Sequence, residues 1–268
     1  MKRIFLASAV VITGMVMTIS SCKKQEPDTE TQSAVDNNIC ETEFTKSMST
    51  INGFAIKEQG VKSMMSSCPT IISADTVATP GWPRTFVIDY GTTGCTDSID
   101  GKVRKGQVYV TVSNRWHIVG SYVKVMLVNY SVNGISYACD SMKIIHSGAY
   151  AFTHQVFNGV CSDGSWTLKW AADRTFTQTG GTSTPLNLYD DVFSLTGNAS
   201  GTTREGKKYT VNIVTPVIKR SSCSWIESGR LDLTPEGLAV RTVDFGNGNC
   251  DSQATLTING NTFTFTMN

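Results

Sequence analysis

The chain has 268 residues, a net charge of +1 and only 17% charged residues, so its charge gives no reason to expect a nucleic-acid partner. Its length suits one large β domain or two small ones, which would bury roughly 70% of the unfolded surface. Thr, Ser, Gly, Val and Asn are abundant, a composition typical of strands joined by tight turns.

Residues 1–21 have the features of a bacterial signal peptide. Two basic residues precede a mostly apolar run at 4–19, which is shorter than the roughly 20 residues that cross a bilayer. Two serines then precede Cys22, and this ending resembles the bacterial lipobox, in which the thiol is acylated and the chain is cut before it. We expect Cys22 to carry acyl chains that hold the protein on a membrane. The alternative is an uncleaved anchor whose cysteine is incidental.

A polar segment and one helix are expected next. Residues 22–36 are predicted to be a flexible tether, because charged and polar side chains dominate the stretch after Cys22. Residues 37–66 contain the best helical candidate, from about 38 to 51, which ends before Asn52-Gly53. Its apolar residues recur at the spacing of one helix face: Cys40, Phe44, Met48 and Ile51.

From residue 67 to 268 the pattern is that of a repetitive antiparallel β domain. Two Asn-Gly pairs, at 133–134 and 259–260, are typical hairpin turns. The sequence therefore predicts an all-β fold, an antiparallel meander that forms a curved sheet, a sandwich or an open barrel, with a short N-terminal helix. Six segments are rich in β-branched and aromatic residues: 85–90, 107–112, 122–130, 165–170, 209–214 and 262–267.

Eight cysteines are present, and seven remain once Cys22 is assigned to the lipid, so at least one is free or pairs between chains. A spacing of 27 residues between two cysteines occurs twice, with an offset of 155. A third predicted pair, Cys139–Cys161, has no support from a repeat, and it leaves Cys40 unpaired. No Cys-x-x-Cys pair occurs, so a zinc site and a thioredoxin-like redox site have no support. We expect no metal and no cofactor. The predicted disulfides are Cys68–Cys95, Cys223–Cys250 and Cys139–Cys161.

Two further sequence repeats accompany the repeated cysteine spacing. Asp-Tyr-Gly at 89–91 matches Asp-Phe-Gly at 244–246 with the same offset of 155. Gly-x-x-Arg-x-Gly-x-x-Tyr at 101–109 recurs at 201–209. We predict that both nine-residue segments are hairpins in which Gly supplies the turn and Tyr begins the returning strand.

These motifs carry a family resemblance. The Pro-Arg-Thr start at 83–85, the Asp-aromatic-Gly segment and its cysteine, the Gly-x-x-Arg-x-Gly hairpins and the closing run at 244–251 resemble uncharacterised surface lipoproteins of Bacteroidota. The resemblance covers roughly residues 67–268. It implies a β architecture and an outer-membrane location, and it brings no catalytic residues.

Few residues suggest chemistry. Asp89 and Asp244 are the best-placed acids: they would form a glycosidase pair if the two halves closed on each other, or each would bond the N–H groups of its own turn. Trp166 and Trp170 would share one face of an unbroken strand, either as an exposed platform for sugars or within the core. No nucleophile, zinc-protease or phosphate-loop motif occurs in the sequence.

We expect a non-enzymatic, lipid-anchored β protein of the outer membrane that acts as a binding or structural module. Its expected partners are the membrane, through the acyl chains, and a glycan or another envelope protein. One alternative is a glycan-binding surface lipoprotein of a polysaccharide uptake system, which requires an exposed aromatic platform. The other is a carboxylate-dependent hydrolase, which requires two close carboxylates in a cleft. Either face of the outer membrane is compatible with these features.

Overall fold

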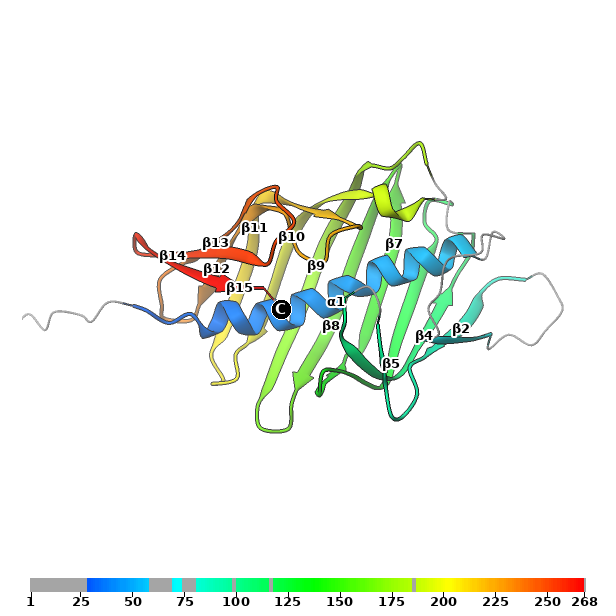
Figure 1. Ribbon diagram of the computed structural model, residues 1–268, viewed down its shortest axis with the longest axis horizontal. Helices are drawn as coiled ribbons and strands as arrows, with labels where there is room; N and C mark the ends of the chain where they lie inside the picture. Colours follow the sequence, from blue (N-terminus) through cyan, green and yellow to red (C-terminus); the bar gives the residue numbers. More distant parts are fainter. Residues whose placement is uncertain are drawn as a thin grey trace, which may run out of the picture.

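The computed structural model describes residues 28–57, 69–73, 81–97, 100–115, 118–184 and 187–267. One helix, α1 (Gln32–Lys57), lies within the curve of a fifteen-stranded antiparallel sheet (Figure 1). The predicted all-β meander with an N-terminal helix is confirmed, and its form is a curved sheet. Within the described ranges, no helix combines the length and apolar character needed to cross a membrane.

Strands that follow each other in sequence are neighbours in the sheet almost throughout. The exceptions are β3, which pairs only with β4, and β7, which pairs with β5 and β8. The first seven strands are β1 (Thr70–Ser73), β2 (Arg84–Asp89), β3 (Cys95–Thr96), β4 (Val103–Val112), β5 (Tyr122–Val132), β6 (Ile135–Ala138) and β7 (Ser141–Gly148). The others are β8 (Ala151–Ser162), β9 (Thr167–Gly180), β10 (Val192–Thr202), β11 (Lys208–Arg220), β12 (Ser228–Pro235), β13 (Arg241–Asn247), β14 (Gln253–Ile258) and β15 (Asn261–Thr266).

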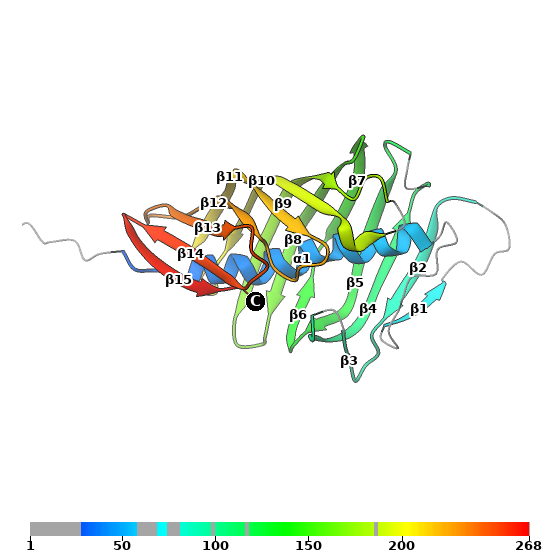
Figure 2. The same ribbon diagram turned by 45° about the horizontal axis from the view of Figure 1, so that its top comes forward.

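The sheet has an inner and an outer face because side chains alternate along each strand. In β9, the side chains of Leu168, Trp170, Ala172 and Arg174 are buried, and those between them are more exposed. The buried set faces α1, and the other set forms the outer surface. The last strands, β12 to β15, come back alongside the N-terminal half of the helix (Figures 1 and 2).

The helix is covered on more than one side. Most residues from Ser33 to Phe44 are buried at consecutive positions, whereas an ordinary surface helix buries one stripe. This explains why its sequence has a weak amphipathic pattern. The core is therefore the space between the inner face of the sheet and this enclosed helix.

The helix is longer than the predicted segment of about 38–51. It begins at Gln32 and ends at Lys57. Residues 32–36, predicted as part of the tether, are helical. The Glu30 carboxylate accepts hydrogen bonds from the backbone N–H of Ser33 at 2.7 Å and from its hydroxyl at 2.8 Å. A side-chain acceptor at a helix start satisfies a backbone N–H that has no partner within the helix. The acidic residues that suggested a tether thus help to begin the helix.

The predicted turns agree with the structure in three places and differ in one. Both Asn-Gly pairs close hairpins, and Asn133 and Asn259 have the positive φ that such turns require. Residues 201–209 form the predicted hairpin from β10 to β11. Residues 101–109 do not, because Val103 through Tyr109 all belong to the single strand β4, so no turn separates Arg104 from Tyr109. All six predicted strand segments overlap observed strands.

Candidate functional site

Charged side chains join the β domain to the first half of the helix and to the residues just before it. Arginines of the β domain donate to carboxylates of the segment that begins at Asp28 and continues through α1, and we call these contacts the arginine ladder. Three of the four arginines are almost completely buried. The contacts are Arg241 with Asp28 and Glu30, Arg204 with Asp36, Arg174 with Glu41, and Arg104 with Glu43.

The densest part of the ladder surrounds Arg104. Its guanidinium lies 3.1 Å from Asp97, 2.9 Å from Asp100 and 3.3 Å from Glu43. Lys46 of α1 also contacts Asp100. Burial raises the pKa of Asp100, but hydrogen bonds from Arg104 and Lys46 outweigh it and hold that pKa well below its ordinary value. Asp100 is therefore charged and paired with two cations, Arg104 and Lys46.

Little space remains beside this cluster. The adjoining cavity is about 30 Å³ and is lined by Glu43, Arg104 and Tyr130 among others. Such a volume accommodates water and is too small for a sugar or peptide. The hydroxyl of Tyr130 donates to Glu43 at 2.6 Å. The buried carboxylates thus serve to hold the helix against the sheet.

Asp89 and Asp244 do not form a pair. They lie on β2 and β13, with eight strands of the main order between them, and the figures place those strands toward opposite ends of the sheet (Figures 1 and 2). Each instead accepts a hydrogen bond from the backbone of its own turn, Asp89 from Gly91 at 2.7 Å and Asp244 from Gly246 at 2.9 Å. Of the two roles that the sequence left open for these aspartates, the structure shows the one in the turn.

The segments of Asp89 and Asp244 are also alike at the second oxygen of each carboxylate, which accepts a hydrogen bond from a neighbouring side chain. Asp89 accepts from the Gln107 amide at 2.8 Å, and Asp244 accepts from Arg230 at 2.7 Å. The Gln107 bond, followed by the turn N–H, lowers the pKa of Asp89. The turn N–H lowers the pKa of Asp244, with a further contribution from Arg230. The internal repeat therefore encodes one strand-end motif used twice.

Trp166 and Trp170 do not form a ligand platform. Trp170 is 1% exposed, its ring stacks on Phe44 with centroids 5.4 Å apart, and its indole N–H donates to Asn37 at 3.0 Å. Trp166 precedes β9, and the Arg204 guanidinium lies 4.6 Å from the centre of its half-buried ring. Of the two alternatives for this pair, core packing is correct for Trp170, which belongs to the inner face and contacts α1.

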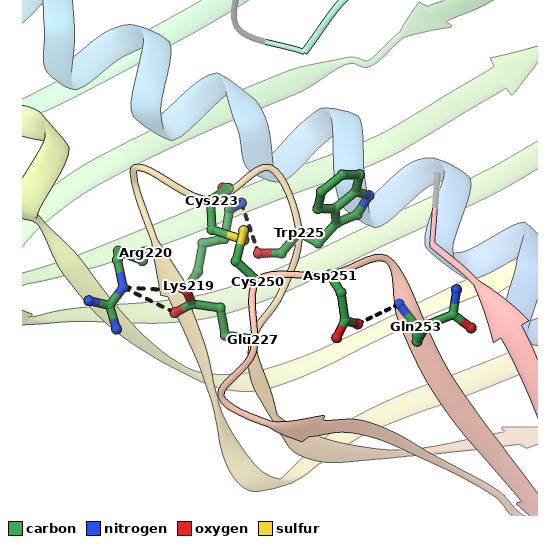
Figure 3. The surroundings of a disulfide bond; sticks show 8 residues. All are labelled: Lys219, Arg220, Cys223, Trp225, Glu227, Cys250, Asp251 and Gln253. Atoms are coloured by element: carbon green, nitrogen blue, oxygen red, sulfur yellow. Dashed lines mark hydrogen bonds and ion pairs between the residues drawn. A yellow bond between two sulfur atoms is a disulfide. The ribbon is translucent and has the colours of Figure 1, made fainter.

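The predicted disulfide between Cys223 and Cys250 is confirmed (Figure 3). It joins the loop after β11 to the loop after β13, and the half-buried Trp225 packs against the core beside it. The Lys219 ammonium donates to the carbonyls of Cys223 and Trp225. Burial, aided by the charge of Lys46, lowers the pKa of Lys219 to about 8.

The same place holds the one group of potential metal ligands found within the described ranges. Cys223, Glu227 and Cys250 bring their ligand atoms together. The two sulfur atoms are bonded to each other and are not thiolates, the form in which cysteine binds zinc. Glu227 instead forms an ion pair with Arg220 at 3.3 Å.

The other cysteines differ from the prediction in one pair. Cys95 is disulfide-bonded, and its predicted partner Cys68, like Cys22, lies outside the described residues. Cys139 and Cys161 are not bonded to each other. Cys161 faces the helix, where its sulfur lies 2.9 Å from that of Cys40. The register of β6 and β8 places Cys161 opposite Tyr137, two positions before Cys139.

A groove of about 830 Å³ crosses the outer face of the sheet from β8 to β12, and we call it the outer groove. Its floor is a row of short side chains in cross-strand register: Ala171 faces Ser200, Ser200 faces Thr210, and Thr210 faces Thr234. Cross-strand neighbours on one face lie about 5 Å apart. Short side chains in such a row leave a channel between the longer ones on either side.

Polar and charged groups surround this floor. Lys169 and Lys208 both pair with Thr202, so their side chains lie on either side of it on the same face. At one end the Asn158 amide donates to Asp140 at 2.6 Å. The turn at 235–238 borders the other end. The lining offers hydroxyl groups that donate and accept, the ammonium groups of Lys169 and Lys208 and the carboxylates of Asp140 and Glu236, so it suits a polar ligand.

Sequence reasoning missed both the arginine ladder and the outer groove. The sequence repeat that contains Arg104 and Arg204 was a signal for the arginine ladder, because both arginines form ion pairs with acidic residues of α1. The groove had no signal, since its floor depends on the register of strands far apart in sequence. The chain matches no protein-family model, no curated protein and no solved structure.

Proposed function

We propose that this protein is a lipid-anchored β protein of the cell envelope that acts as a non-enzymatic binding module, with the outer groove as its binding surface. The observation that supports the proposal is the location of free space. The outer groove measures about 830 Å³, whereas the interior cavity measures about 30 Å³ beside paired charges. A ligand would reach the groove without displacing any element of the core.

The anchor is proposed from the sequence, since residues 1–27 lie outside the described part of the chain. A diacylated Cys22 would make the membrane the first partner of the protein. The test is metabolic labelling with a fatty acid, followed by membrane fractionation. We expect Cys22→Ala to lose the label and to leave the membrane fraction, while Cys139→Ala retains both. Membrane retention of unlabelled Cys22→Ala would contradict the anchor.

The lining of the groove indicates the ligand chemistry. Hydroxyl groups of Ser200, Thr202, Thr210 and Thr234 with two ammonium groups favour a ligand rich in hydroxyl, carbonyl or carboxylate oxygens. Acidic sugars and polar metabolites both have this chemistry. Glycan binding through stacking on Trp166 and Trp170 is not part of the proposal, because Trp170 is buried.

The binding test uses one substitution that fills the groove and one matched control. Ala171 lies on the groove floor, and Thr177 lies on the outer face of the same strand, beyond the groove. Thermal-shift measurements with a library of acidic and neutral oligosaccharides should find a ligand that stabilises the parent and Thr177→Trp. The same ligand should not stabilise Ala171→Trp. Equal stabilisation of Ala171→Trp would exclude the groove, and chemical turnover of the ligand would exclude a purely binding role.

A further inference from the structure

We propose that Cys40 of α1 and Cys161 of β8 form a disulfide in the mature protein, which attaches the enclosed helix covalently to the sheet. Their sulfur atoms are 2.9 Å apart, and both side chains are 0% exposed. A disulfide bond is about 2.05 Å long, so closing this distance requires a movement of less than 1 Å. The two residues are 121 positions apart in sequence.

The position of Cys40 is fixed by the contacts on either side of it. One turn before it, Asn37 accepts from the Trp170 indole at 3.0 Å, and one turn after it Phe44 stacks on the same ring. Glu41, the next residue, forms the two-point ion pair with Arg174. The helix can neither slide nor rotate without breaking these contacts, so the approach of the two sulfurs is a property of the docked helix.

The strand is equally constrained on its side. A Cβ atom added at Gly159 of β8 would lie 3.0 Å from the Phe44 ring, which shows how closely the helix approaches this strand. Tyr137, opposite Cys161 in the sheet, meets Phe44 edge-on with ring centroids 5.9 Å apart. Both cysteines thus belong to one tightly packed layer.

The rest of the molecule supplies the redox context. Cys223 and Cys250 are bonded and Cys95 is also in a disulfide, so the protein belongs to a compartment in which disulfides persist. Two thiols held in contact under such conditions are expected to be oxidised. The pairing would leave Cys139 as the unpaired cysteine of the described residues, in place of Cys40.

The oxidation requires a partner, and the one we name is the disulfide of a thiol–disulfide oxidoreductase. The thiolate of one cysteine attacks that disulfide and forms a mixed disulfide; the thiolate of the second cysteine then attacks the mixed disulfide and releases the partner. In total the two thiols lose two protons and two electrons, and the partner disulfide becomes a dithiol.

The first exchange must precede complete docking of the helix. Neither sulfur is accessible once α1 is in place. Burial, followed by the contact with Cys161, also raises the pKa of the Cys40 thiol well above its ordinary value, which disfavours the reactive thiolate. An oxidant therefore reaches one of the cysteines while the helix is still undocked, and docking brings the second thiol to the mixed disulfide.

The experiment maps the disulfides of the full-length protein isolated from the cell envelope. The protein is denatured without reductant, alkylated with iodoacetamide, digested and analysed by mass spectrometry. We expect a peptide that links Cys40 to Cys161, with alkylation at Cys139 alone among the cysteines from position 40 onward. Alkylation at both Cys40 and Cys161, or a link between Cys139 and Cys161, would overturn the proposal.

Single substitutions provide a second measurement. Cys40→Ala should add Cys161 to the alkylated positions, and Cys161→Ala should add Cys40. Cys139→Ala should abolish alkylation from position 40 onward. If Cys40→Ala and Cys161→Ala leave the labelling pattern of the parent unchanged, the two cysteines are not paired. Because labelling is measured after denaturation, a loss of stability in a variant does not obscure the result.

Discussion

Glu41 of α1 and Arg174 of β9 form a two-point ion pair, in which the guanidinium donates to the two carboxylate oxygens at 2.9 and 2.7 Å. Both side chains are buried. Buried ion pairs lose much of their Coulombic gain to desolvation, so this contact specifies where the helix lies more than it stabilises the fold. The other contacts of the arginine ladder join further arginines to Asp36 and Glu43 of the helix and to Asp28 and Glu30 just before it.

The first prediction concerns that pair. Glu41→Ala leaves the Arg174 guanidinium buried without its carboxylate, and we expect the free energy of unfolding to fall by about 3–5 kcal/mol. Urea denaturation measures this change. The matched control is Glu205→Ala, which breaks an exposed pair with Lys207 and should have little effect. A loss below about 1 kcal/mol for Glu41→Ala would show that the pair does not secure the helix.

The second prediction concerns Gly106, where β4 bulges against β5. Its φ is +85°, and a Cβ atom there would lie 2.2 Å from the carbonyl oxygen of Asn129. We expect Gly106→Ala to lower the free energy of unfolding by roughly 2–4 kcal/mol, measured by urea denaturation. Gly148→Ala, where no atom lies within 4 Å, is the control and should be tolerated. Equal stability of the two variants would contradict the described bulge.

The third prediction concerns pH. His154 is fully buried beside Phe176, and neither ring nitrogen has a hydrogen-bond partner within the described part of the chain. Burial, together with the charge of Arg174, lowers the pKa of His154 to about 3. The unfolded chain takes up a proton near pH 6.5, which the folded protein resists. His154 therefore causes stability to fall as the pH drops from about 6.5 toward 3.

His154→Leu should remove this dependence. At pH 5 the parent should have lost about 2 kcal/mol through this residue, whereas at pH 7.5 the effect should be close to zero. Urea denaturation of both proteins at pH 5 and pH 7.5 tests the difference. The same pH dependence in the parent and the variant would show that His154 is not buried in its neutral form.

The fourth prediction concerns the confirmed disulfide. Cys223 and Cys250 are 27 residues apart, and the chain-entropy model assigns roughly 3–4 kcal/mol to a loop of this size. The double variant Cys223→Ala/Cys250→Ala should lose about this much stability to urea under non-reducing conditions. Cys139→Ala removes an unbonded cysteine and should cost less than about 1 kcal/mol. Similar losses in the two proteins would mean that the disulfide adds no stability.

Sequence periodicity predicted the strands and turns well, because the information for them is local. Alternation of side chains identifies a strand within a few residues, and Asn133 and Asn259 with their glycines specify tight hairpins without reference to the rest of the fold. The repeated cysteine spacing identified Cys223–Cys250 in the same way. The helix was found, but its start was placed too late, since its polar first turn has partners only in the folded protein.

The sequence by itself determined the β meander, three of the four predicted turns and one disulfide. Only the tertiary structure decided which face of the sheet encloses the helix, and this placed Trp170 in the core and Cys161 against Cys40. It also decided that Asp89 and Asp244 lie far apart and that short side chains of β9 to β12 line up as a groove floor. These features depend on the register and curvature of strands distant in sequence, and a shift of one residue would move each side chain to the opposite face.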